Sequence, residues 1–184
     1  MLTARGARRD TTSRFKLDRC LDILDDNKLI GQLACDLGST QAAFTIDDQS
    51  YTMEAMEAEP DEPLAELLRQ NTEARGKLAS KAFALKDTTG HTLALAKQVK
   101  SSFVVVHAGN AFVLRKASLF SPPYLLYRTD SDQPLGSVGQ KSFFNRTLHM
   151  DLPAELDATS QVFLLMLALQ LATQRAANNV NNYN

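Results

Sequence analysis

The chain of 184 residues has too few cysteines and too little net charge for several protein classes. Its two cysteines, Cys20 and Cys35, are too few for a disulfide framework, and we expect both to be reduced thiols. They fall on the two arms of one predicted hairpin, where they could be neighbours. The formal net charge is −1, whereas a dedicated nucleic-acid-binding protein usually has a strong basic excess. The composition therefore argues against a disulfide-rich scaffold and against a nucleic-acid partner.

The sequence also lacks a hydrophobic run long enough for a membrane-spanning helix. Its most apolar segment, residues 162–172, has Gln170 as the only polar residue. Such a segment rises only ~16 Å as a helix, whereas the hydrocarbon core of a bilayer is ~30 Å thick. No apolar region follows the N-terminal arginines, so we expect no secretory signal peptide. We expect a cytoplasmic protein that is not transmembrane, with peripheral membrane binding left open.

No recognisable constellation of catalytic or metal-binding residues is present. His91, His107 and His149 are scattered, without a ligand spacing such as His-x-x-x-His. The two cysteines do not form a Cys-x-x-Cys pair, so we expect no structural zinc site. The Gly-x-x-Gly segment 136–139 is too short for a phosphate-binding loop, which also requires a following helix. We therefore expect a protein without metal or cofactor, and not an enzyme.

What the chain does have is a long series of short apolar segments separated by acidic or glycine-containing turns. This pattern predicts about eleven antiparallel strands, joined by turns such as residues 25–27, 47–49 and 108–110. A short helix with Leu64, Leu67 and Leu68 interrupts them, with its N-cap expected at Asp61 and its end at Gly76. The expected strands are residues 15–24, 28–35, 42–46, 50–54, 78–86, 91–98, 102–107, 111–116, 124–128, 135–140 and 145–150.

The last helix, expected over residues 158–177, has no polar side, and a helix that is apolar all round must be enclosed. A meander of so many strands curls or closes rather than remaining open. A barrel of about a dozen strands would leave a space that an α-helix, ~10–12 Å across, would fill. We therefore predict a mainly β protein, a closed antiparallel barrel of about twelve strands around a central hydrophobic C-terminal α-helix. A pleckstrin-homology-like layout is the alternative, but it needs about seven strands and an amphipathic helix.

Three parts are expected along the chain. Residues 1–14 are basic, polar and without periodicity, which predicts a disordered N-terminal arm. Residues 15–177 form a single barrel domain that includes the central helix. Residues 178–184 form a flexible tail.

The end of the chain resembles the tubby-like superfamily, which includes tubby C-terminal domains, phospholipid scramblases and LURP-one-related proteins. The resemblance lies in Leu152-Pro153-x-x-Leu156, in Gln161-x-Phe163-Leu164-Leu165, and in the hairpin from Tyr124 to Gly139. It spans roughly residues 15–177 and implies a closed barrel of about twelve strands around a hydrophobic C-terminal helix. The chain has no tryptophan and no recognisable cysteine-rich, proline-rich or calcium-binding segment of the scramblase kind, so lipid scrambling is not expected.

Basic residues in two neighbouring hairpins give the only functional indication. If they gather on one side of the barrel, they form an electropositive surface, and the resemblance implies phosphoinositide head groups as ligands. We expect a non-enzymatic binding module for anionic phospholipid or phosphorylated ligands. The alternatives are a protein-interaction or regulatory scaffold that uses the acidic segment 54–66, and an enzyme with its site at a barrel mouth. The candidate ligand-binding residues are Lys81, Lys86, Lys97, Lys100, Arg115 and Lys116.

Overall fold

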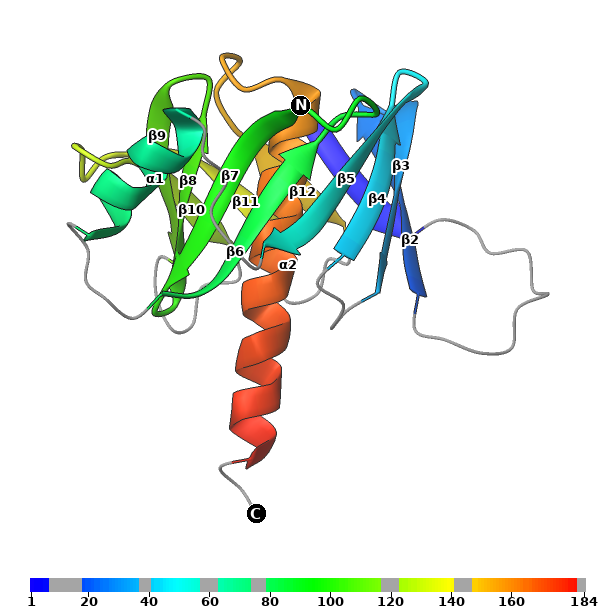
Figure 1. The fold of residues 1–184 in the computed structure, drawn as a ribbon. Coiled ribbons are helices and arrows are strands. Elements are labelled where there is room, and N and C mark those ends of the chain that lie inside the picture. The colour runs from blue at the N-terminus through cyan, green and yellow to red at the C-terminus, as the bar shows by residue number, and fades with distance from the viewer. Residues whose placement is uncertain are drawn as a thin grey trace.

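Twelve strands form a closed antiparallel barrel in the computed structural model, which describes residues 1–6, 18–36, 41–56, 63–73, 79–116, 123–140 and 147–181 (Figure 1). The strands follow one another around the barrel in chain order, and β1 closes it between β2 and β12. Helix α1 (Pro63–Glu73) separates β5 from β6, and helix α2 (Ala158–Asn181) follows β12. The strands are β1 (Leu2–Gly6), β2 (Asp18–Asp25), β3 (Lys28–Asp36), β4 (Gln41–Ile46), β5 (Gln49–Met56), β6 (Ala79–Lys86), β7 (Thr92–Val99), β8 (Ser102–His107), β9 (Asn110–Lys116), β10 (Tyr124–Arg128), β11 (Pro134–Gln140) and β12 (Leu148–Asp151).

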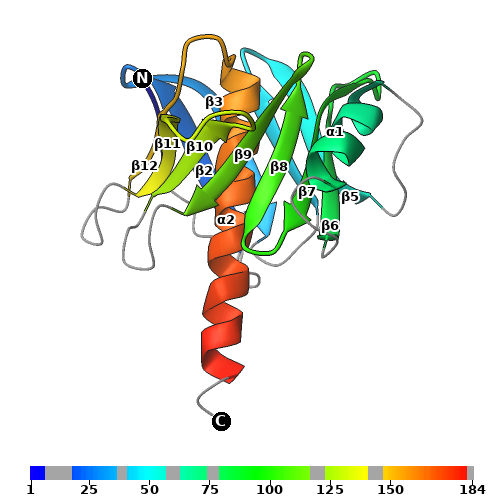
Figure 2. The ribbon, with the colours of Figure 1, turned by 90° about the vertical axis from the view of Figure 1, so that its left-hand side faces the viewer.

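Helix α2 runs through the middle of the barrel and leaves it at one end, as two perpendicular views show (Figures 1 and 2). Each residue from 162 to 168 is at most 3% exposed. These side chains form one cluster with the inward residues of the strands, among them Phe83, Leu114 and Leu126. The predicted fold is therefore confirmed, because a helix that is apolar on every side is enclosed by strands on every side.

Side-chain hydrogen bonds hold the N-terminal end of α2 in the barrel. The Ser160 amide donates to the Asp157 carboxylate at 2.7 Å, so Asp157 caps the helix. The Nδ1 atom of His107 lies 3.1 Å from the Leu93 carbonyl oxygen, and its Nε2 lies 3.1 Å from the Ser160 hydroxyl. Because a carbonyl oxygen can only accept, Nδ1 donates and Nε2 accepts the Ser160 proton. The His107 imidazole thereby links β7 and β8 to the helix.

Helix α1 covers the outer face of β7, β8 and the neighbouring part of β9 (Figures 1 and 2). Ala65 and Leu68 of the helix pack there against Leu95, Val104 and Val106. The run of valines in β8 is buried on both faces of the sheet, because its alternate residues face α1 and α2.

The expectation that residues 1–14 are disordered is wrong for Leu2–Gly6, which form β1. Leu2 and Ala4 are 6% and 0% exposed, and β1 pairs with both β2 and β12. The segment has only two inward apolar residues among polar ones, and one of its two partner strands, β12, lies at the other end of the chain. Residues 7–14 lie outside the described residues. At the other end, α2 extends to Asn181, so the helix is longer than the expected 158–177.

The expected hairpin turns are confirmed where the structure describes them. Asp26 and Asn27 have φ angles of 43° and 69°, and Asp47 and Asp48 have 46° and 64°. Two successive left-handed residues are the mark of the tight turn that suits the twist of antiparallel strands. The helix boundaries expected at Asp61 and Gly76 lie outside the described residues.

The two cysteines are on adjacent strands but are not directly opposite. In the β2–β3 register Cys20 faces Ala34, whereas Cys35 faces Arg19. Cys20 is exposed and is a free thiol.

Candidate functional site at the helix-exit mouth

The two ends of the barrel differ in their connections. The hairpin turns β2–β3, β4–β5, β6–β7, β8–β9 and β10–β11 lie at one end, together with the start of α2, and we call this end the turn mouth. Helix α2 leaves at the other end, the helix-exit mouth (Figures 1 and 2). Because neighbouring strands are antiparallel, β6 and β8 begin at the helix-exit mouth, and β7 and β9 end there.

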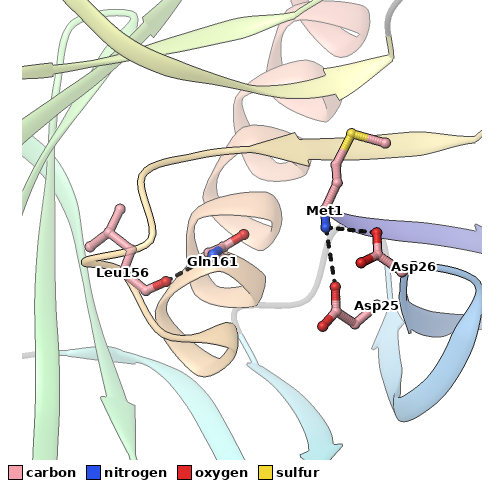
Figure 3. Close-up of polar contacts among 5 residues, drawn as sticks. All are labelled: Met1, Asp25, Asp26, Leu156 and Gln161. Atoms are coloured by element: carbon pink, nitrogen blue, oxygen red, sulfur yellow. Dashed lines mark hydrogen bonds and ion pairs between the residues drawn. The ribbon is translucent and has the colours of Figure 1, made fainter.

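Carboxylates are concentrated at the turn mouth. The amino group of Met1 lies 3.1 Å from Asp26 and 3.2 Å from Asp25, and hydrogen bonds to these two carboxylates raise its pKa (Figure 3). The Asp87 carboxylate accepts hydrogen bonds from the hydroxyl and amide of Thr89 and from the amide of His91, which lower its pKa. The acidic residues at this end are Asp25, Asp26, Asp47, Asp48, Asp87, Asp130, Asp132, Asp151, Glu155 and Asp157.

Several of these carboxylates bond to neighbouring groups at the same end of the barrel. Within the described ranges, no group of three or more His, Cys, Asp or Glu side chains is placed to hold a metal ion. A cavity of ≈290 Å³ lies beside the start of α2, where Gln161 donates to the Leu156 carbonyl oxygen at 2.8 Å (Figure 3). Its lining includes Asp25 and Asp151 together with apolar groups such as Met150 and Leu152.

The structure brings most of the candidate basic residues to the helix-exit mouth. Lys81 lies near the start of β6 and is exposed, Lys97 lies near the end of β7, and Lys100 lies in the turn between β7 and β8. Arg115 and Lys116 end β9. We call these five residues the basic mouth.

Lys86 does not belong to this group. It lies at the opposite end of β6 and forms an ion pair with Glu54 of β5. Lys86 is the last residue of the expected strand 78–86 and lies about 16 Å beyond Lys81 along it. Its pairing with Glu54 depends on the register of β5 and β6.

Aromatic rings hold two of the basic side chains in place. The Arg115 guanidinium lies over the Tyr127 ring, 4.2 Å from its centroid, and the Lys116 ammonium lies 6.0 Å from the centroid of Tyr124. Cation–π contacts of this kind contribute about 0.5–1 kcal/mol at exposed sites. They restrict the two cationic groups to defined positions beside β10.

Arg115 also lines a pocket of ≈220 Å³ on the outer wall of β9 and β10. The loop after β10 forms the rest of its lining, and the Thr129 amide donates to the Ala111 carbonyl oxygen of β9 at 3.3 Å. Arg115 Nη2 lies 3.7 Å from the Asp132 carboxylate. Sequence reasoning missed this pocket, because the return of the loop toward β9 leaves no periodic signal.

The cationic side chains of the basic mouth can attract and position phosphate groups at one end of the barrel.

No helix in the described part of the chain is both long and apolar enough to cross a bilayer. Comparisons of the chain with protein-family models, with curated proteins and with solved structures find no match.

Proposed function

We propose that the chain is a tubby-like barrel that acts as a non-enzymatic module and binds anionic phospholipid surfaces through its basic mouth. The observation that supports this proposal most strongly is the separation of charge along the barrel. Five of the six candidate cations come from β6, β7, β9 and the β7–β8 turn at the helix-exit mouth, whereas carboxylates predominate among the described residues of the turns at the other end. The tubby-like assignment is supported by the closed barrel of twelve strands around a C-terminal helix.

The distance between the two ends keeps their fields apart. A strand of seven residues, such as β9, spans about 23 Å, whereas the Debye length at physiological ionic strength is about 8 Å. Most carboxylates at the turn mouth are therefore largely screened from a surface that touches the basic mouth. Asp132 is the exception, because the β10–β11 loop brings it within 3.7 Å of Arg115. Each basic residue near an anionic leaflet contributes about 1 kcal/mol, so five of them are enough for reversible peripheral binding.

The hydrogen-bonded pair of Ser160 and His107 is interpreted as structural. Ser160 bonds to His107 but is 3% exposed and lies in the first turn of α2. A nucleophile must reach its substrate, so this pair supports a structural rather than a catalytic interpretation.

The acidic segment 54–66 gains no support as a second functional surface. Glu54 pairs with Lys86, and Glu66 pairs with Arg69 at 2.7 Å within α1. Residues 57–62 lie outside the described residues.

Vesicle co-sedimentation tests the proposal. Wild type should bind phosphatidylglycerol-containing vesicles at low salt, and replacement of Lys97, Lys100, Arg115 and Lys116 by glutamine should reduce that binding. Replacement of Lys28, an exposed lysine beside the β2–β3 turn, should not. Equal binding by all three proteins would reject the basic mouth as the binding surface.

A further inference from the structure

The pocket between β9 and the β10–β11 loop brings one cation and two carboxylates together. Its lining consists of Arg115, Tyr127, Thr129, Asp130, Ser131 and Asp132. The loop is ordered by its own hydrogen bonds. The Ser131 amide donates to the Arg128 carbonyl oxygen at 3.3 Å, and the Gln133 amide donates to the Ser131 hydroxyl at 3.1 Å. The loop backbone that carries Asp130 and Asp132 is thus ordered before any ligand arrives.

The ion pair inside the pocket is loose. The Arg115–Asp132 separation of 3.7 Å exceeds the ~2.7–2.9 Å of a charge-assisted hydrogen bond, and the two side chains are 44% and 104% exposed. Exposed pairs of this kind contribute little to stability. A ligand that offers an anion to Arg115 and a cation to Asp132 can therefore replace the direct contact without a large cost.

The charges in the pocket select against simple ions. A bare anion on Arg115 would meet the carboxylates of Asp130 and Asp132, and a bare cation on those carboxylates would meet Arg115. A ligand that carries both charges satisfies both sides. We infer that this pocket binds a phosphodiester that carries a primary ammonium group, with the phosphate on Arg115 and the ammonium on Asp132 and Asp130. The inference rests on the proposed function and names the head-group class that the surface prefers.

A primary ammonium fits this pocket better than a quaternary one. A primary ammonium has three N–H donors for carboxylate oxygens, whereas a trimethylammonium group has none and is recognised mainly by aromatic faces. The ring of Tyr127, the aromatic residue of the lining, is already covered by the Arg115 guanidinium at 4.2 Å. The pocket should therefore distinguish phosphoethanolamine from phosphocholine head groups.

Two vesicle compositions test the inference. Both contain the same minor fraction of phosphatidylglycerol, and the remainder is phosphatidylethanolamine in one and phosphatidylcholine in the other. Wild type should bind the ethanolamine vesicles about fivefold more tightly, as expected for roughly one additional ion pair. Asp132→Asn should remove this preference, whereas the control Asp47→Asn, in the exposed β4–β5 turn, should retain it. Arg115→Gln should weaken binding to both compositions.

An experiment with soluble head groups distinguishes the pocket from the proposed membrane binding. It also distinguishes a lipid from a free solute as the source of the head group. Glycerophosphoethanolamine, titrated into the wild type, should shift the amide NMR signals of residues 127–132, and glycerophosphocholine should not. Absence of vesicle binding with these shifts present would reject the proposed function but support the pocket. Vesicle preference without the shifts would identify the membrane, rather than a free solute, as the source of the ligand. Equal binding of both vesicle types, unaffected by Asp132→Asn, would overturn the inference and leave the proposed function intact.

Discussion

Gln98 and Gln174 exchange two side-chain hydrogen bonds, of 2.8 and 3.2 Å, although they are 76 residues apart in the chain. Gln98 is the next-to-last residue of β7, beside the basic mouth, and Gln174 lies on α2 three residues beyond the buried Leu171. The Gln98 amide also donates to the Lys100 carbonyl oxygen at 3.1 Å. The pair therefore fixes the depth of α2 in the barrel and links the helix to the turn that carries Lys100.

Removal of one member of this pair should cost measurable stability. Gln174→Ala leaves the side chain of Gln98, which is 6% exposed, without its partner on α2. An unsatisfied buried polar group costs about 1–3 kcal/mol, and the bond from Gln98 to Lys100 should keep the loss near the lower end. Urea unfolding measures it, with Gln133→Ala in the exposed β10–β11 loop as control. A loss no larger than that of the control would show that the pair does not hold the helix.

The first strand should be required for the closed barrel. Ala4→Asp places a carboxylate at a position that is 0% exposed, where it has no room for water, so we expect a large loss of stability or insoluble protein. Arg5→Gln changes the next residue, which faces outward and is exposed, and should change stability by no more than about 0.5 kcal/mol. Thermal melts compare the two variants. Similar melting temperatures for both would contradict the placement of β1.

Two glycines form a matched pair for the packing of neighbouring strands. A Cβ atom on Gly31 would lie 1.9 Å from the Thr45 carbonyl oxygen of β4, whereas a Cβ atom on Gly6 would have nothing within 4 Å. Gly31→Ala must push backbone apart, and overpacking of this kind costs about 1–3 kcal/mol. Gly6→Ala should be neutral or slightly stabilising. Equal free energies of unfolding for the two variants would show that β3 and β4 do not approach so closely.

The Asp87 turn predicts a defined pH dependence. Hydrogen bonds from Thr89 and the His91 amide lower the pKa of this carboxyl below its ordinary 3.8. The ionised carboxylate therefore stabilises the fold fully above about pH 4, and this contribution is lost as the pH falls through the lowered pKa of the folded state. Asp87→Asn should accordingly melt below wild type at about pH 6, and the difference should shrink by about pH 3. A difference that stayed constant or grew in acid would contradict the proposed sign.

The central helix and most hairpins could be predicted because their signals are local. Residues 162–168 are apolar whichever way the helix is turned, and Asp-Asp-Asn or Ala-Gly-Asn between apolar segments favours a tight turn wherever it occurs. Features that depend on partners far away in the sequence could not be predicted from such local signals. Leu95 of β7 is buried on the outer face of the sheet, and only the position of α1 accounts for that.

The candidate site likewise combines features with a local sequence signal and features that depend on distant partners. The sequence supplied the basic residues, and the antiparallel connections brought five of them to one mouth. The pairing of Lys86 with Glu54 and the contact of Arg115 with Asp132 depend on strand register and on the path of one loop. Neither property appears in the spacing of charges along the chain.

The central functional claim is that the basic mouth binds anionic membranes, and vesicle binding as a function of salt tests it most directly. Wild type and the fourfold variant of Lys97, Lys100, Arg115 and Lys116 are compared by co-sedimentation at low and at moderate salt, with Lys28→Gln as control. Ion pairs at a solvated surface weaken with screening, so wild type and Lys28→Gln should bind at low salt and lose much of that binding at moderate salt. The fourfold variant should bind weakly at both salt concentrations and should retain the melting temperature of wild type, because surface substitutions change stability little. Strong, salt-independent binding by the fourfold variant would contradict the account.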